Sequence, residues 1–197
     1  MVEIPPELRD DRPAIDAITP TALVTGMGQS LMDDFVRARN KVMKNEDHPA
    51  ILGVNRSCQF IKTHMNFTLD RDNASYWRSV AIHPEGQWYS VQPDATKTHE
   101  DYPWIEGWWP KLAGSGSSAW FAAKAALIMG YERVILCGVP LEPGPYADGI
   151  YAPTFQDAEK FPSTIRTMRE KMQLDEWTHD AVFSMSGWTK EFFGGPV

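Results

Sequence analysis

The sequence has few of the features that mark secreted proteins or nonspecific nucleic-acid binders. It contains two cysteines in 197 residues, Cys58 and Cys137, which are too few for a disulfide framework. Lys and Arg number 19 against 26 Asp and Glu, so the formal net charge is −7. Because neutralising many phosphates requires a surplus of basic residues, this balance disfavours a nonspecific polyanion binder. We therefore expect no nucleic-acid partner.

Membrane features are also absent from the sequence. No apolar run approaches the ~18 residues that are needed to span a bilayer. The N-terminal stretch MVEIPPELRDD carries prolines and acids where a secretory signal has basic residues followed by an apolar run. We therefore expect a cytoplasmic protein with no membrane span.

What is present fits one globular domain. Hydrophobic residues make up 43% of the chain and aromatic residues 12%, a profile typical of a protein with a packed core. Residues 1–20 contain four prolines and no sustained period, which predicts an irregular N-terminal arm. We expect residues 21–197 to form a single domain.

Strand-like and helix-like segments alternate along this domain. Short apolar runs predict strands at 21–25, 50–54, 64–70, 134–137 and 181–185. Apolar spacings of three and four predict a helix at 29–43, a run of good helix formers after serine cap candidates predicts one at 119–129, and a polar helix is expected at 163–174. Between 71 and 112 only short strand-like pieces stand out, such as SVAIH and WYSVQ. The alternation predicts a three-layer α/β sandwich of the Rossmann type with a mostly parallel central sheet.

The stretch TALVTGMGQSL places a glycine-rich turn between a strand and a helix. Gly26 and Gly28 match half of a dinucleotide fingerprint, but Leu31 occupies the position of the third glycine, which disfavours a dehydrogenase. The turn, with Gln29 and Ser30 leading into the helix, could hold an anion at the positive end of the helix dipole. The alternative is a tight corner without a ligand.

A second glycine- and serine-rich segment precedes the helix at 119–129. Its members are Gly114, Ser115, Gly116, Ser117 and Ser118. In a parallel sheet, both helix starts would face the same edge and could bind different parts of a nucleotide. The alternative is a flexible loop with a helix cap.

Three polar residues follow predicted strands. Asn55 comes directly after the strand at 50–54, and its side-chain amide can both donate to and accept from a base or sugar. Asp70 and Asp72 form an Asp-x-Asp pair, which could hold a divalent metal against a diphosphate. Capping or turn formation is the alternative for all three residues.

Three histidines of the middle region are candidate general bases near neutral pH, namely His64, His83 and His99. Asp70 is a further candidate catalytic residue. No histidine spacing resembles a zinc site, and each histidine could equally be structural.

Taken in order, VTGMGQSL, ILGVNRSCQF and SGSSAWFAAKAALIMGYERVILCGVPL resemble a superfamily of bacterial oligosaccharide sialyltransferases and archaeal-type 6-hydroxymethylpterin pyrophosphokinase-like proteins. Phage and bacterial chains of unassigned function share this pattern. The resemblance covers roughly residues 21–142. The chain differs from the family at Met27 and Gln29, where asparagine and proline are frequent, and no histidine of its C-terminal part matches the sialyltransferase general base.

The resemblance implies a transferase that uses a nucleotide-activated donor. Gly26, Gly28 and Ser30 would form the phosphate turn, Asn55 would contact the nucleotide, and residues 115–118 would contact the donor. The preferred expectation is a sialyltransferase-like glycosyltransferase that binds a nucleotide sugar as a small-molecule partner. The alternatives are a Mg²⁺-dependent pyrophosphokinase-like enzyme and a non-catalytic nucleotide-binding module.

Overall fold

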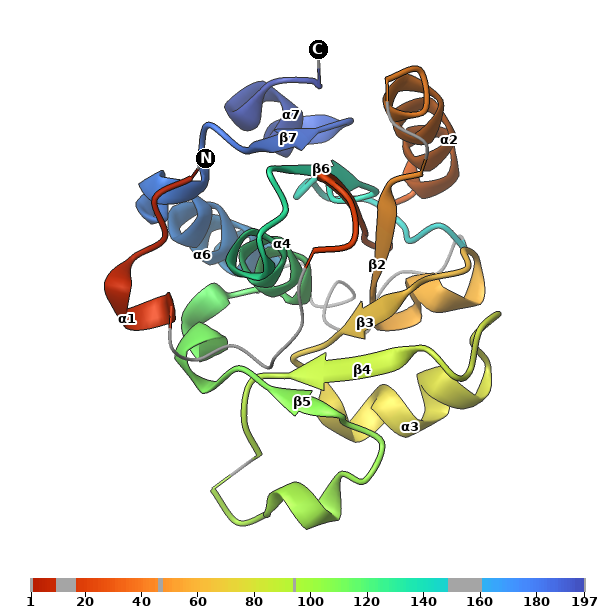
Figure 1. Cartoon of the computed structure of the whole chain (residues 1–197), viewed down its shortest axis with the longest axis vertical. Helices are drawn as coiled ribbons and strands as arrows, with labels where there is room; N and C mark the ends of the chain where they lie inside the picture. The colour runs from red at the N-terminus through yellow and green to blue at the C-terminus, as the bar shows by residue number, and fades with distance from the viewer. Residues whose placement is uncertain (1, 10–16, 46–47, 94, 149–160, 197) are drawn as a thin grey trace.

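A parallel β-sheet forms the centre of the computed structural model (Figure 1). The structure describes residues 2–9, 17–45, 48–93, 95–148 and 161–196. Within these residues the strands are β1 (Thr21–Thr25), β2 (Ala50–Val54), β3 (Met65–Phe67), β4 (Gln87–Ser90), β5 (Gly107–Trp108), β6 (Arg133–Cys137) and β7 (Val182–Ser184). All of their pairings are parallel, which confirms the predicted fold class.

The strand order creates a switch point beside β1. The order is β5-β4-β3-β2-β1-β6-β7, so the chain builds outward from β1 on one side and then crosses over to add β6 and β7 on the other. Thr25 of β1 is in register with Cys137 of β6, and both strands end at the same level. In open α/β sheets, ligands bind in the crevice outside the carboxyl ends of the strands at such a point.

Helical elements cover both faces of the sheet. On one face lie α2 (Leu31–Val42), the short helix η1 (Asn55–Gln59) and α3 (Arg71–Ser79). On the other lie α4 (Ser118–Met129), α6 (Phe161–Leu174) and α7 (Gly187–Phe193). Alternate strand residues point to opposite faces, so that Leu23 packs under α2 whereas Val24 packs under α4.

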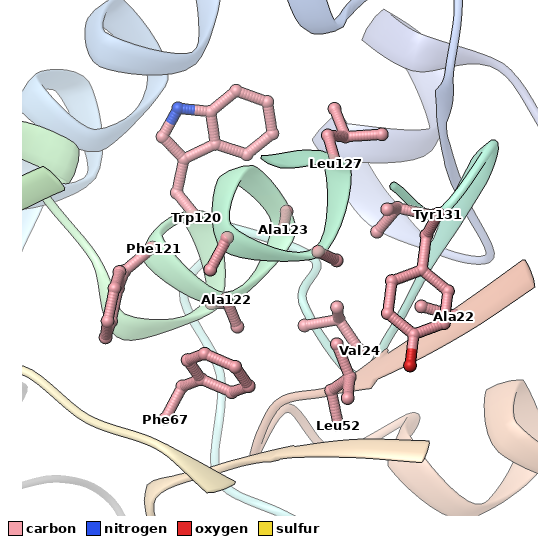
Figure 2. Close-up of a cluster of buried hydrophobic side chains, with 14 of the residues drawn as sticks. Ala22, Val24, Leu52, Phe67, Trp120, Phe121, Ala122, Ala123, Leu127 and Tyr131 are labelled. Atoms are coloured by element: carbon pink, nitrogen blue, oxygen red, sulfur yellow. The ribbon is translucent and has the colours of Figure 1, made fainter. Parts of the chain in front are cut away.

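Helix α4 lies against the middle of the sheet and is buried along its whole length. Figure 2 shows Ala122, Ala123 and Phe121 of α4 beside Val24 and Phe67 of the strands. Small alanine side chains let the helix approach the sheet closely, and this close packing explains why the run AWFAAKAALIM is so apolar. Gly130 ends the helix with a φ of 101°, as its position after the apolar run predicts.

The region 71–112 differs most from the sequence prediction. The segment SVAIH is not a strand, because its residues form the end of α3 and the turn that follows. Helix α3 was missed because only Ala74 and Trp77 of its nine residues are buried, which leaves too short an apolar period to detect. The remaining short helices are η2 (His99–Asp101), η3 (Pro110–Ser115) and η4 (Glu176–Thr178).

The described part of the N-terminal arm lies on the domain and includes the one-turn helix α1 (Pro6–Arg9). Val2, Ile4 and Leu8 pack against the main core. Residues 10–16 of the arm lie outside the described residues. Among the helices that the structure describes, none is long and apolar enough to cross a membrane.

Candidate functional site

The glycine turn after β1 is hydrogen-bonded to the turn after β6. The backbone N–H of Gly26 donates to the carbonyl of Cys137 at 2.8 Å, and that of Gly28 donates to the carbonyl of Gly138 at 2.7 Å. These two amides are therefore used within the fold. Contact of this turn with a phosphate remains a prediction. Because the Gly26 and Gly28 amides are already hydrogen-bonded, Gln29 and Ser30 would have to make that contact.

Close approach of the two turns explains why glycine occupies positions 26 and 28. A Cβ atom at Gly26 would lie 2.6 Å from the carbonyl oxygen of Gly138, and one at Gly28 would lie 2.5 Å from Cδ of Pro140. Real Cβ atoms do not approach other heavy atoms this closely. The tight corner is therefore a structural requirement, whether or not a ligand binds there.

A buried carboxylate, which the sequence did not reveal as a site residue, stabilises the glycine turn by hydrogen bonds. Asp34 of α2 is 2% exposed, and its Oδ2 atom accepts from Ser30 Oγ at 2.8 Å, from Ser186 Oγ at 2.5 Å and from the Gly138 N–H at 3.0 Å. These donors follow β1, β7 and β6 respectively. The i, i+4 spacing of Ser30 and Asp34 on a helix was the only signal in the sequence.

Asn55 stands at the carboxyl end of β2 in an unusual conformation. Its φ is 52°, a left-handed value that few residues other than glycine adopt without cost. Its Nδ2 atom donates to Asp70 Oδ2 across 3.4 Å, while its Oδ1 atom is buried and has no hydrogen-bond partner. An unsatisfied buried acceptor costs free energy, so a ligand donor at this oxygen would be favourable.

Asp70 follows β3 and begins α3. Its backbone N–H donates to Thr68 Oγ1 at 2.8 Å, which fixes the turn. Burial of the carboxyl raises the pKa of Asp70, and the nearby charge of Arg71 opposes this rise. Asp70 as a whole is nevertheless exposed to solvent. Asn55 and Asp70 thus lie side by side beyond the ends of β2 and β3, and their contact with a ligand remains a prediction.

Asp72 has different partners from Asp70. Its carboxylate lies 2.6 Å from Lys97 Nζ and accepts a hydrogen bond from the Tyr102 hydroxyl at 3.2 Å. The hydrogen bond from Lys97 lowers the pKa of Asp72, and that from Tyr102 adds to the effect. In the part of the chain that the structure describes, no three His, Cys, Asp or Glu side chains are grouped to hold a metal ion.

The serine-rich loop contributes one side chain near Asp70. Ser118 Oγ accepts from the backbone N–H of Leu69 at 3.0 Å, so the start of α4 lies beside the end of β3. Ser115 donates to the Leu112 carbonyl at 2.6 Å, and Ser117 caps α4 by accepting from the N–H of Trp120 at 3.2 Å. Ser115 and Ser117 are thus engaged in the fold.

The two glycines of this loop differ in their surroundings. Gly116 has a φ of 81° and lies against α6, where an added Cβ would be 3.1 Å from Lys171 Cγ. Nothing lies within 4 Å of a Cβ added at Gly114. Nucleotide contact by either glycine remains a prediction.

The loop after β6 crosses the glycine turn and reaches η1. The N–H of Ala147 donates to the Met27 carbonyl at 2.8 Å, and Asp148 pairs with Arg56 at 2.9 Å. The Arg56 guanidinium also lies over the Tyr146 ring, 5.2 Å from its centroid. Residues 149–153 of this loop lie outside the described residues.

Two of the candidate histidines lie at the amino ends of the strands, opposite to the carboxyl ends where Asn55 and Asp70 lie. His64 immediately precedes β3, where its Nδ1 atom accepts from the Ile51 N–H at 2.9 Å, and His83 lies in the turn before β4. Burial lowers the pKa of His64, the hydrogen bond with the Ile51 backbone opposes this, and the nearby Lys62 and His83 side chains lower it further. The structure does not bring these two histidines together with Asn55 and Asp70.

His99 lies in η2, between β4 and β5. Its ring stacks on Trp108 with centroids 4.7 Å apart. This contact is a structural role for His99, and a catalytic role remains a prediction.

Comparison with known proteins supports the fold. No protein-family model matches the chain, and no curated protein is significantly similar to it in sequence. The structure resembles the sialyltransferase CstII from Campylobacter jejuni in complex with the substrate analogue CMP-3FNeuAc, with a TM-score of 0.58, 10% identity and coverage of 90% of this chain and 89% of that one. A second structure, CST-II with a trisaccharide acceptor and CMP, gives a TM-score of 0.59 and 13% identity, with 89% and 85% coverage.

At these identities the likeness establishes a shared fold. The part of the resemblance that concerns pyrophosphokinase-like proteins receives no support from these comparisons. The chain thus has a sialyltransferase-like, Rossmann-like fold along about nine-tenths of its length.

Proposed function

We propose that the protein is a glycosyltransferase that takes its sugar from a nucleotide sugar. The observation that carries this proposal is the buried, unpartnered Oδ1 atom of Asn55, held beside Asp70 at the carboxyl edge of the sheet. A sugar or base donor group would satisfy this oxygen. The fold likeness to structures determined with CMP-3FNeuAc and with CMP supports a cytidine nucleotide as the first donor to test.

The residues around Asn55 suggest how the donor would be held. The start of α4 at Ser118 presents the positive end of a helix dipole, which favours the negative phosphate of the donor. Arg56 would add a positive charge if its pairing with Asp148 were exchanged for a phosphate. Both groups would stabilise the nucleotide as it leaves.

Asp70 would act on the acceptor. A carboxylate whose pKa is raised by burial is a stronger base than an ordinary aspartate, so it can take the proton of an attacking hydroxyl more readily. In a metal-dependent variant of the reaction, the same carboxylate would hold Mg²⁺ against the donor phosphates.

Release of nucleotide from a panel of CMP, UDP and GDP sugars tests this proposal. Each sugar is incubated with the purified protein and with simple glycan acceptors, once with Mg²⁺ and once with EDTA. We expect release from one donor class by the wild type and at least a tenfold slower release by Asp70→Asn. Equal rates for the two proteins would remove Asp70 from the reaction, and loss of release in EDTA would identify the metal-dependent form.

A non-catalytic nucleotide-binding module is the second candidate. It is favoured by the positions of His64 and His83, which lie at the amino ends of the strands, away from Asn55. Neither of these two histidines can therefore act as a general base beside Asn55, and Asp70 is the base candidate that is left. This candidate predicts that a nucleotide binds and is retained without turnover. Binding in the absence of any release from the donor panel would favour it over the transferase.

A further inference from the structure

Asn55, on which the proposed function depends, has hydrogen-bonded backbone groups on both sides of its left-handed conformation. The N–H of Val54, which precedes it, donates to Ser57 Oγ at 2.8 Å. The carbonyl of Asn55 itself accepts from the Cys58 thiol at 3.3 Å. Burial raises the pKa of Cys58 to about 12, so the thiol keeps its proton and can donate. Two side chains of η1 thus hold the backbone before and after the Asn55 side chain.

Ser57 is in turn hydrogen-bonded to Thr25, the last residue of β1. Both side chains are fully buried, and their hydroxyl oxygens lie 3.0 Å apart. The Thr25 hydroxyl also donates to the Leu52 carbonyl at 3.3 Å. Because a hydroxyl has one proton, Ser57 must be the donor in the bond between the two hydroxyls. The hydrogen bonds therefore run from Ser57 through Thr25 to the Leu52 carbonyl, and the Ser57 oxygen accepts from the backbone.

The backbone conformation of Asn55 is one that surrounding contacts must impose. A φ of 52° brings Cβ of an L-residue close to the following carbonyl oxygen, and such conformations persist where the neighbouring structure fixes them. The conformation also sets the direction in which the side chain leaves the backbone. A change to a negative φ would turn the side-chain amide of Asn55 away from Asp70, to which its Nδ2 atom donates.

We propose that Thr25 and Ser57 are positioning residues that hold Asn55 in the left-handed conformation and so place its Oδ1 atom for contact with the nucleotide donor. Both side chains are 0% exposed, so they act on the donor through Asn55 and not by touching it. This role rests on the proposed function, since it prepares the contact that the proposed function requires. The alternative is that the two hydroxyls stabilise the end of β1 and have no influence on Asn55.

Variants of the full chain separate these two roles. Thr25→Val keeps the branched shape but removes the hydroxyl, so the buried Ser57 proton loses its acceptor and the Ser57 side chain must turn away from the backbone. Ser57→Ala removes the other hydroxyl and should act in the same way, whereas Thr25→Ser keeps the hydroxyl. Thr178→Val is the matched control, because the buried Thr178 hydroxyl donates to the Asp175 carbonyl at 2.7 Å in η4, before β7.

The φ of Asn55 is the first measurement, and it needs no ligand. Crystal structures of the variants give this angle, and the scalar coupling between the amide and α protons of Asn55 reports it in solution. We expect Thr25→Val and Ser57→Ala to move Asn55 out of the left-handed region. Thr25→Ser and Thr178→Val should leave its φ near the 52° of the wild type. An Asn55 that keeps this φ in Thr25→Val and in Ser57→Ala would overturn the positioning role.

Nucleotide affinity is the second measurement. Each protein is titrated with CMP, UDP and GDP by isothermal titration calorimetry. We expect Thr25→Val to raise the dissociation constant of the nucleotide that the wild type binds by about tenfold, the factor expected for loss of one well-placed hydrogen bond. Thr25→Ser and Thr178→Val should stay within about twofold of the wild type, because distant sites act independently. An equal loss in Thr25→Val and Thr178→Val would show general destabilisation and overturn the positioning role.

The two measurements separate failure of the positioning role from failure of the proposed function. If the wild type binds none of the three nucleotides, the proposed function is contradicted, and the φ of Asn55 in Thr25→Val still supports or overturns the control of its conformation by Thr25. If a nucleotide binds wild type and Thr25→Val equally well, the nucleotide site stands and the positioning role is wrong.

Discussion

The carboxylate of Asp34 accepts a hydrogen bond from the backbone N–H of Gly138 at 3.0 Å and thereby joins the first turn of α2 to the turn after β6. Ser30 and Ser186 donate to the same oxygen, so one buried atom connects the ends of three strands. These strand ends form the switch point of the sheet. The geometry of the candidate site therefore depends on a carboxylate that would not itself touch a ligand.

Asp34→Asn should destabilise the protein by about 2 kcal/mol. An amide oxygen in the place of Oδ2 can still accept from the three donors, but it lacks the negative charge that strengthens these hydrogen bonds, and the NH₂ group would replace the oxygen that faces Arg37. Urea unfolding measures the difference in free energy. Asp33→Asn, at the exposed neighbouring position, is the matched control and should change stability by less than about 0.5 kcal/mol. Equal effects of the two variants would contradict the role assigned to Asp34.

Gly28→Ala should destabilise the protein by about 1–3 kcal/mol, because the new methyl group would lie within 2.5 Å of Pro140 and must displace the loop. Gly114→Ala is the matched control, since open space surrounds that position. It should be neutral or slightly stabilising, by up to about 1 kcal/mol. Thermal unfolding of both variants measures the contrast, and a stable Gly28→Ala protein would show that the corner is less tight than described.

The stability of the protein should fall as the pH drops below about 6.5, the unperturbed value for histidine. The pKa of His64 is lowered in the folded state by burial, so the unfolded chain binds more protons in this range and acid favours unfolding. His64→Asn keeps an acceptor for the Ile51 N–H but does not titrate. Its unfolding free energy should depend less steeply on pH between 7 and 5, and an unchanged slope would assign the titration to another group.

Asp70→Asn should have opposite effects on stability and on function. Burial raises the folded-state pKa of Asp70, so its ionised form costs stability once the pH rises through that value. At pH 7 the variant should therefore be more stable than the wild type, by an amount that screening by solvent keeps small. Urea unfolding at pH 7 in the absence of nucleotide measures this gain. A less stable variant would indicate that Asp70 is structural.

The fold could be predicted from the sequence wherever burial imposes a clear pattern. The runs TALVT, AILGV and RVILC lie in the middle of the sheet and are apolar because both of their faces are covered. Helix α3 has two buried residues, and β5 is a strand of two residues. Neither element is therefore long or buried enough to produce a hydrophobic periodicity in the sequence. The same lack of pattern explains why SVAIH was mistaken for a strand.

Two of the candidate site residues could be placed from the sequence, because each follows a predicted strand. The carboxyl ends of parallel strands lie together, and the structure places the Asn55 and Asp70 side chains 3.4 Å apart; contact of either residue with a ligand remains a prediction. The position of the histidines at the opposite edge depends on where loops begin, which the weak pattern of the middle region does not reveal. Asp34 was missed because an acid in the first turn of a helix is ordinarily exposed and favourable there.

Thermal unfolding with nucleotides, for the wild type and for Asn55→Gly, tests the central claim most directly. Glycine adopts the φ of 52° at this position without strain, so the substitution removes the side chain and leaves the backbone intact. The proposal predicts that a nucleotide or nucleotide sugar at ~100 times its dissociation constant stabilises the wild type by about 2.7 kcal/mol. It also predicts that the variant shows little or no such gain. Absence of stabilisation by every CMP, UDP and GDP compound, or an equal gain in both proteins, would contradict a nucleotide site at Asn55.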